Sequence, residues 1–388
     1  MVKLKIRKVL QNQYGAGSEW TQIQNLRRIK IMRKRIMFIA IVVLSVAILP
    51  FVVYGQPAAK MINMKFATYF PPPSAQAKLW EEFCKEIEKR SNGRVTITFY
   101  AGGTLLGAVP MADGVTEGIT DIGLFNVNYT PGRYPVSEAA TLPLGYPTGW
   151  VSSHVMEDFW REFKPKELDK LHVLTAASHG PLVIWSKDPI YKMEDLKGKR
   201  IRQVGLGADM LKLLGGSPSS MPVGEVYEAM AKGVLDGIGL PLETGKVYKF
   251  AEVSKYVIYI GGVSNFGVFY TAMNRKSWDN LPKDIQAVFN AVSVEYVEKS
   301  ARMWNEIDLE GLEFSIERGV KFIELSPEEK ARWQKTVQPV IGKYVQDMVA
   351  RGFSEQEVRS YLEYARKRND HWIKKQTELG IKTTSGPK

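Results

Sequence analysis

The sequence has 388 residues, with 53 lysines and arginines against 41 acidic residues, and its formal net charge is +12. The excess is concentrated at the start of the chain, because residues 1–55 contain ten basic residues and a single acid, Glu19. The remaining residues carry 43 basic and 40 acidic side chains, so their net charge is only +3. Nucleic-acid binding needs a strongly basic surface, and we therefore expect no nucleic-acid partner.

The first segment has the pattern of an export signal. Three basic residues at 33–35 precede an uncharged run over residues 36–59, and small residues lie three and one positions before a cleavage point at Gln56. We therefore expect residues 1–55 to be a basic N-region and a signal peptide, and translation starts either at Met1 or at Met32, which opens a signal of ordinary length. Cleavage would leave the mature protein in the periplasm or another extracytoplasmic space. The uncharged run is also long enough to cross a bilayer, so a retained membrane anchor is the alternative.

From residue 60 onward, predicted strands alternate with predicted helices, and this alternation indicates an α/β fold. The strand patterns lie at residues 63–70, 94–100, 172–178, 199–205 and 257–262. The first expected helix covers residues 75–92, and its apolar stripe includes Cys84. Since Cys84 is the only cysteine of the chain, it forms no intramolecular disulfide, and we expect it to be buried.

The pattern changes after Pro282. Residues 283–318 show apolar side chains at helical spacing, with no interruption except Gly311. This predicts either one very long helix or two helices broken at Gly311. Two further helices are expected to begin after Ser326 and Ser354, because a glutamate follows each serine three residues later in the pattern of a capping box.

Two segments of the chain resemble each other. Residues 117–125, EGITDIGLF, and residues 232–241, KGVLDGIGLP, each place a glycine at the expected end of a helix, an aspartate three residues later and then a short apolar strand. This echo predicts two similar lobes. Ligands of open α/β sheets bind beyond the carboxyl ends of the strands, so two facing lobes would share a binding cleft.

The sequence contains no recognisable catalytic or metal-binding motif. Its histidines lack the spacing of zinc ligands; they are His154, His172, His179 and His371. The segment GLGADM, residues 205–210, lacks the third glycine of a dinucleotide-binding loop. We therefore predict a protein that is not an enzyme and needs no cofactor or metal. The alternative is a secreted or membrane-anchored α/β enzyme that acts on a small organic acid with catalytic residues brought together from distant positions.

Four segments point to a known family. They are VTEGITDIGL (115–124), ATLPLGYP (140–147), EDLKGKRIR (194–202) and LLGGSPSSMPVGEVYEAMAKGVLDG (213–237). In this order they resemble the solute-binding subunits of tripartite ATP-independent periplasmic (TRAP) transporters, the DctP-type family, and the similarity extends from about residue 64 to about residue 323. The resemblance implies a two-lobed α/β fold like that of other periplasmic binding proteins, with crossing strands and a long bracing helix, the segment from residue 283.

The resemblance also assigns a role to one of the basic residues between positions 197 and 202. In this family an arginine at the end of the LKGxxIR strand binds the carboxylate of the substrate, and that position is Arg202 here. A guanidinium holds a carboxylate through two parallel hydrogen bonds, which a lysine cannot do. Lys197 and Lys199 are expected to be solvated turn residues, and Arg200 to lie at the outer end of the same strand face.

Several positions differ from the sialic-acid-binding members of this family. Leu182 takes the place of a second arginine, and Leu240 takes the place of an asparagine. Val223 replaces an aromatic residue, and Asn126 replaces a glutamate. These changes imply a monocarboxylate with a hydrophobic or aromatic body rather than a polyhydroxylated sugar acid. The further residues expected to line the cleft are Tyr69, His179, Trp185 and Gln203.

The resemblance implies how the chain divides and what it binds. The expected parts are an N-terminal segment (1–55), lobe 1 (60–180 plus about 265–305), lobe 2 (181–264 plus about 306–375) and a C-terminal tail (376–388). We expect a monomer that captures a small-molecule carboxylate, an organic acid, between the lobes and delivers it to the TRAP membrane permease subunits. Hinge rotation near Gly180 and Asn265 is expected to close the cleft.

Overall fold

The structure, a computed structural model, describes residues 26, 28–32, 34, 37 and 61–384. The chain divides into residues 1–59 and residues 60–388, and the second part contains all the elements below. The predicted cleavage point at Gln56 and the uncharged run, apart from Met37, lie outside the described residues. Among the described residues, no helix is both long and apolar enough to cross a membrane.

The first sheet has five strands in the order β2-β1-β3-β10-β4. Their bounds are β1 Ile62–Thr68, β2 Val95–Tyr100, β3 Ile122–Asn126, β4 Leu171–Ala177 and β10 Phe269–Asn274. β1 pairs in parallel with β2 and β3, whereas β10 lies antiparallel between β3 and β4. All six residues of β10 are buried, so a strand from a later part of the chain completes the interior of this sheet.

Helices pack on the first sheet; they are α3 Ala75–Arg90, α4 Met111–Glu117, α5 Gly149–Phe163 and α10 Arg275–Asp279. α3 begins at Ser74, whose hydroxyl accepts a hydrogen bond from the backbone N–H of Ala77 at 3.1 Å and so caps the helix. Cys84 is buried in this helix, as predicted. Burial raises the pKa of its thiol, so Cys84 behaves as a core residue rather than as a nucleophile.

The second sheet has six strands in the order β11-β9-β5-β8-β6-β7. Their bounds are β5 Val183–Ser186, β6 Arg200–Arg202, β7 Ser217–Ser219, β8 Gly237–Leu240, β9 Tyr256–Tyr259 and β11 Lys321–Glu324. The short helices in this part are α6 Leu206–Leu213, α7 Val226–Ala231, α8 Thr244–Val247 and α9 Phe250–Val253. The chain passes from one sheet to the other between β4 and β5 and again between β9 and β10. The predicted α/β fold with crossing segments is confirmed.

The two similar segments, residues 117–125 and 232–241, occupy equivalent positions in the two sheets. Gly118 and Gly233 both have positive φ angles, 80° and 75°, after the helices α4 and α7. The carboxylate of Asp121 accepts a hydrogen bond from the backbone N–H of Lys65 in β1, and that of Asp236 accepts one from Arg200 in β6, both at 2.8 Å. Each aspartate therefore ties its own strand to the neighbouring parallel strand.

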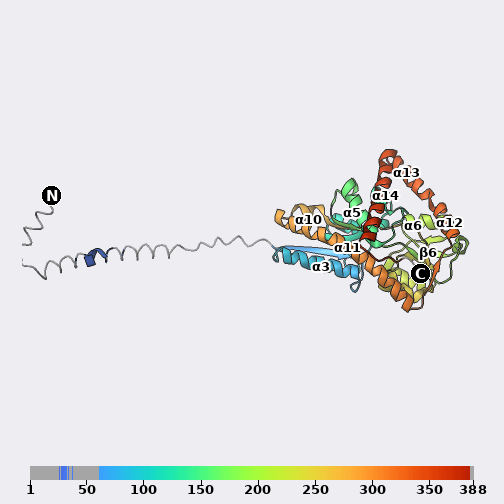
Figure 1. Ribbon diagram of the computed structural model, residues 1–388, viewed down its shortest axis with the longest axis horizontal. Coiled ribbons are helices and arrows are strands. Elements are labelled where there is room, and N and C mark those ends of the chain that lie inside the picture. Colours follow the sequence, from blue (N-terminus) through green and yellow to red (C-terminus); the bar gives the residue numbers. More distant parts are fainter. Residues whose placement is uncertain (1–25, 27, 33, 35–36, 38–60, 385–388) are drawn as a thin grey trace, which may run out of the picture. The chain divides into compact units, whose positions relative to one another are not determined.

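A single helix, α11 (Lys283–Glu317), contains 35 residues and contacts elements on both sides of the fold. It packs against α3, α5 and β4 next to the first sheet and against α8 next to the second; Figure 1 shows it running diagonally through this unit from the α10 end. Gly311 does not break it. A Cβ at Gly311 would lie 2.3 Å from the carbonyl oxygen of Leu242, so this glycine allows the close approach of the segment before α8.

Three helices follow β11; they are α12 Pro327–Val337, α13 Pro339–Ala350 and α14 Glu355–Glu378. The hydroxyls of Ser326 and Ser354 accept hydrogen bonds from the N–H groups of Glu329 and Glu357, so both predicted caps are confirmed. α14 packs on α5, beside the first sheet, although residues up to 375 were grouped with lobe 2. The spacing of apolar residues defines such a helix but not its partner, and the division into lobes stays a prediction.

Candidate functional site

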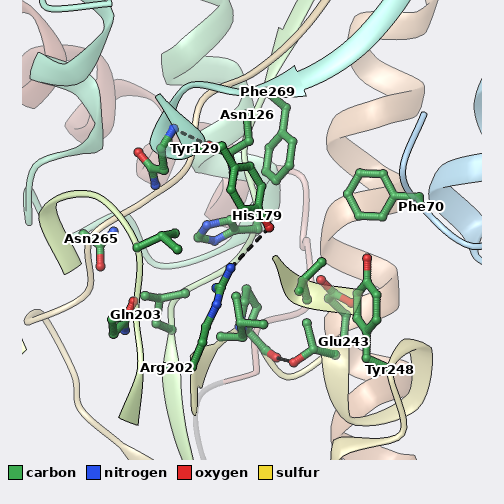
Figure 2. Close-up of a pocket in the computed structure, with 18 of the residues that line it drawn as sticks. Phe70, Asn126, Tyr129, His179, Arg202, Gln203, Glu243, Tyr248, Asn265 and Phe269 are labelled. Atoms are coloured by element: carbon green, nitrogen blue, oxygen red, sulfur yellow. Dashed lines mark hydrogen bonds between the residues drawn. The ribbon is translucent and has the colours of Figure 1, made fainter. Parts of the chain in front are cut away.

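One pocket lies where the strands of both sheets end. Its empty space, open solvent at the mouth included, is about 540 Å³. Lining residues follow β1, β3, β6 and β8, and the two crossing segments add others. Figure 2 shows Gln203 and Asn265 on one side of Arg202, and Phe70, Glu243 and Tyr248 on the other.

Arg202, the last residue of β6, is almost completely buried, with 1% of its surface exposed. Its Nε donates to the carbonyl oxygen of Met221 at 3.0 Å, and its Nη2 donates to the hydroxyl of Tyr129 at 3.2 Å (Figure 2). No carboxylate oxygen within the described part of the chain lies within 4.0 Å of the guanidinium. An arginine has five N–H groups, so three remain available to an anion in the pocket.

The other basic residues of this run have different surroundings. Arg200 is exposed, and its Nη2 donates to the carbonyl oxygen of Gly233 at 2.7 Å. Lys197 is exposed, as predicted. Lys199 is partly exposed and its ammonium group pairs at the surface with the exposed carboxylate of Asp188 at 2.7 Å. Only Arg202 of the four turns into the pocket.

His179 lies at the pocket and joins the two crossing segments. Its Nε2 accepts a hydrogen bond from the backbone N–H of Gly267 at 3.0 Å, so its Nδ1 carries the proton and donates to the carbonyl oxygen of Gly180 at 2.7 Å. Burial lowers the pKa of His179 to about 4, which keeps the ring neutral at pH 7. His179 therefore holds the two crossing segments together as a neutral side chain.

Asn126 positions the part of the pocket wall that carries Tyr129, the residue that contacts Arg202. Its side-chain oxygen accepts a hydrogen bond from the backbone N–H of Asn128 at 2.9 Å and starts a short 3-10 helix at residues 127–129. This turn carries Tyr129, whose ring meets that of Tyr69 edge-on at a centroid distance of 5.8 Å. One of the two hydrogen-bond acceptors of Arg202, the hydroxyl of Tyr129, is thus supplied by the segment that follows β3.

Much of the remaining lining is aromatic or aliphatic. Phe269 and Trp304 stack with ring centroids 4.9 Å apart, and Phe70 meets Trp304 edge-on at 5.8 Å. The positions at which the sequence replaces polar or aromatic residues of the sialic-acid-binding members also line the pocket; they are Leu182, Val223, Leu240 and Asn126. Three of these four are aliphatic, so the body of a ligand would meet mainly apolar side chains.

A buried acidic pair lies at the end of the pocket away from Arg202. Glu243 lines the pocket with 4% of its surface exposed, and its backbone N–H donates to Oδ1 of Asp308 at 3.0 Å. Burial, and next the charge of Asp308, raise the pKa of Glu243 well above its usual range. Burial also raises the pKa of Asp308 to about 7. A buried carboxyl group of this kind is protonated more readily than one in water.

Eight of the nine residues predicted for the cleft line the pocket, and the ninth does not. The eight are Tyr69, Asn126, His179, Leu182, Arg202, Gln203, Val223 and Leu240. Trp185 is fully buried behind it, with its Nε1 donating to the carbonyl oxygen of Pro241 at 3.4 Å. Alternation along β5 explains the error, because Trp185 lies on the strand face opposite that of Leu182 and Ile184.

Sequence reasoning missed the remaining lining residues, which are Phe70, Asn128, Tyr129, Val204, Gly239, Pro241, Glu243, Thr244, Tyr248, Asn265, Phe269 and Trp304. Asn265 was named, but only as a hinge position. A signal existed for some of them, since Val204 and Pro241 follow β6 and β8, and Gly239 lies within β8, next to its last residue.

Residues 66–347 match the family of bacterial extracellular solute-binding proteins, family 7, the DctP family. The chain belongs to this family. A TRAP solute-binding protein from Desulfovibrio salexigens is 30% identical, with 79% of this chain and 95% of that chain covered and a TM-score of 0.69. A TRAP solute-binding protein from Rhodoferax ferrireducens in complex with copurified benzoate is 25% identical, with 81% and 99% covered and a TM-score of 0.75.

Curated relatives point in the same direction. A monocarboxylate 2-oxoacid-binding periplasmic protein from Nostoc is 26% identical over 66% of this chain and 71% of the relative. The C4-dicarboxylate-binding periplasmic protein DctP from Rhodobacter capsulatus is 26% identical over 73% of this chain and 86% of the relative. This TRAP family consists of solute-binding proteins rather than enzymes, which confirms the predicted class and removes the alternative of an enzyme.

Proposed function

We propose that this protein is the extracytoplasmic solute-binding subunit of a TRAP transporter and that it captures an organic acid in the pocket between its two sheets. The carboxylate of the ligand is bound by Arg202. The observation that carries this proposal is a buried guanidinium without a carboxylate partner among the described residues and with N–H groups left for an anion. A buried charge is stable only when paired, and the ligand provides that pair.

The body of the ligand is proposed to be hydrophobic or aromatic. Leu182, Val223 and Leu240 offer it aliphatic contacts, and the stacked pair Phe269 and Trp304 offers aromatic ones. Copurified benzoate in the Rhodoferax ferrireducens protein and the Nostoc relative, a monocarboxylate 2-oxoacid-binding protein, support a monocarboxylate with such a body.

The remaining steps of the proposal concern export and delivery. The mature chain begins near Gln56, acts outside the cytoplasm as a monomer, and passes its ligand to the TRAP permease in the membrane. Residues 60–180 with 265–305 and residues 181–264 with about 306–375 act as two lobes, α14 packing with the first. The lobes close by rotation at the segments near Gly180 and Asn265, because neither side alone removes water from the carboxylate.

A thermal-shift screen of organic acids against wild type and Arg202→Ala tests this function. At least one monocarboxylic acid is expected to raise the melting temperature of the wild type, since a ligand at about 100 times its Kd stabilises the folded state by about 2.7 kcal/mol. The same acid should give no shift with Arg202→Ala. Lys197→Ala, which removes an exposed cation outside the pocket, serves as the control. Binding of no acid, or equal shifts with and without Arg202, contradicts the proposal.

A further inference from the structure

The end of the pocket opposite Arg202 contains polar atoms without partners. Oε2 of Glu243 and the hydroxyl of Tyr248 are buried and have no hydrogen-bond partner within 3.5 Å in the described part of the chain, although the side-chain amide of Gln76 lies near enough to the carboxyl group of Glu243 to lower its pKa. Both residues line the pocket, and Figure 2 shows them on the same side of it. An unsatisfied buried polar atom costs about 1–3 kcal/mol, so this end, here called the Glu243 end, favours a ligand that completes these bonds.

The charge of the Glu243 end limits what such a ligand can carry. Asp308 accepts the backbone N–H of Glu243, and its charge acts on the carboxyl group of Glu243 within a buried region. The pKa of each is raised by burial, and that of Glu243 is raised further by Asp308. Burial therefore favours the protonated form of Glu243, and a protonated carboxyl group both donates and accepts hydrogen bonds, as the hydroxyl of Tyr248 also does.

We propose that the Glu243 end is a second recognition site that selects monocarboxylic acids with a hydroxyl group at the far end and rejects dicarboxylic acids. The hydroxyl donates to one of Glu243 and Tyr248 and accepts from the other. This inference rests on the proposed function, because it assumes that the carboxylate of the ligand is bound by Arg202. It names the substrate class as hydroxylated monocarboxylates with an apolar body.

Two other chemistries fit this end less well. A second carboxylate would be buried at this end without a cation, because Arg202 is the only lysine or arginine among the described residues that line the pocket. A buried carboxylate without a partner is strongly unfavourable. An ammonium group would bind only if Glu243 gave up its proton beside Asp308, in a region where burial opposes ionisation. Both chemistries are outcomes of the test below.

Calorimetry at pH 7.5 with two series of acids tests the inference. The aromatic series is benzoate, its 3- and 4-hydroxy derivatives, its 3- and 4-aminomethyl derivatives, isophthalate and terephthalate. The aliphatic series is pentanoate, 5-hydroxypentanoate, 5-aminopentanoate and glutarate. In at least one series the hydroxy acid should bind about tenfold more tightly than its parent, equivalent to about 1.4 kcal/mol, and the diacid about tenfold more weakly than the parent. The inference is overturned if the parent acid and the hydroxy acid bind with equal affinity in both series. It is also overturned if the amine-bearing acid or the diacid binds more tightly than the hydroxy acid.

Two substitutions of Glu243 test whether its side chain acts as a protonated carboxyl group or as a carboxylate. Glu243→Gln keeps a donor and an acceptor, and the preference for the hydroxy acid should stay within about threefold of wild type. Glu243→Leu removes both and should abolish the preference. Loss of the preference in Glu243→Gln would mean that Glu243 acts as an anion. Tyr248→Phe, which retains the ring and removes the hydroxyl, is the second variant in case Glu243→Leu does not fold, and it should reduce the preference at least threefold.

The control variant is Glu310→Gln, because Glu310 is exposed on α11 and pairs with Lys246 at 2.7 Å outside the pocket. It should leave the preference unchanged. The experiments distinguish failure of the proposed function from failure of this inference. If no acid binds, or if binding does not depend on Arg202, the proposed function fails. If acids bind through Arg202 without preference for a hydroxyl group, only the inference fails.

Discussion

The two ends of the pocket differ in how their polar groups are supported. Arg202 belongs to a strand of the second sheet, and Met221 and Tyr129 hold two of its N–H groups before any ligand arrives. Glu243 precedes the short helix α8, and its Oε2 has no partner among the described residues. A cation held in place binds an anion with little reorganisation. The Arg202 end would therefore provide affinity for acids in general, and the Glu243 end would choose among them.

The largest expected effect comes from removing the cation. Arg202→Ala should weaken binding of an acid found by screening at least about a hundredfold, because a charge-assisted bond contributes about 1.5–3 kcal/mol and its loss leaves the carboxylate buried without a partner. Arg202→Lys should restore only part of the affinity, since an ammonium group does not reproduce the planar arrangement of donors. Isothermal titration calorimetry provides the measurement.

Lys199→Ala is the matched control for this experiment. Lys199 belongs to the same basic run but pairs with Asp188 outside the pocket, and a charge at some distance is screened over about 8 Å at physiological salt. Its loss should change affinity by no more than about threefold. Similar losses for Arg202→Ala and Lys199→Ala would show that the run acts through its total charge and that Arg202 has no special position.

The second effect is a pH dependence of the free energy of unfolding, and it arises from Asp308 next to the Glu243 end. The pKa of Asp308 is about 7 in the folded protein because of burial, whereas an aspartate in an unfolded chain has a pKa of about 3.9. Between these values the unfolded state has lost a proton that the folded state keeps, so the free energy of unfolding falls as pH rises, by about 1.4 kcal/mol per unit. Asp308→Asn removes this contribution while its side-chain oxygen still accepts the N–H of Glu243.

The expected result is that Asp308→Asn gains about 2 kcal/mol relative to wild type between pH 5 and pH 7, and only about 0.4 kcal/mol more above pH 7. Urea unfolding at pH 5, 6, 7 and 8 measures the difference. Glu306→Gln, at an exposed position of the same helix, should follow the wild-type curve at every pH. Parallel curves for Asp308→Asn and wild type would mean that Asp308 is already ionised at pH 5, and the Glu243 end would then carry a full negative charge.

The same comparison explains which parts of the site could be predicted from the sequence. Arg202 lies in a recognisable segment, at the end of a strand that pairs with β8 on one side and β7 on the other. The aspartates Asp121 and Asp236 were found because each is part of a local pattern that ends a helix and starts a strand. Each of these patterns consists of residues that are close together in sequence, so it can be recognised without knowing the fold.

The Glu243 end depends instead on contacts between distant segments. Glu243 meets Asp308 only because α11 crosses the segment before α8 at Gly311. The spacing of apolar residues predicts that α11 is a helix, but it does not predict which segments of the chain this helix contacts. The misplacement of Trp185 is different, since strict alternation along β5 from Leu182 would have placed it on the far face.

The smallest expected effect tests how far the Arg202 end is prearranged. Tyr129→Phe removes the hydroxyl that accepts from Nη2 of Arg202 at 3.2 Å and keeps the aromatic ring, whose centroid lies 5.9 Å from the guanidinium carbon. A neutral hydrogen bond contributes about 0.5–1.5 kcal/mol, and the freed N–H can turn to the ligand, so affinity should fall by only about threefold. Calorimetry with the acid used for Arg202 measures this loss. A hundredfold loss would instead mean that the hydroxyl of Tyr129 binds the carboxylate itself, and the anion site would then consist of two residues from different sheets rather than of one supported arginine.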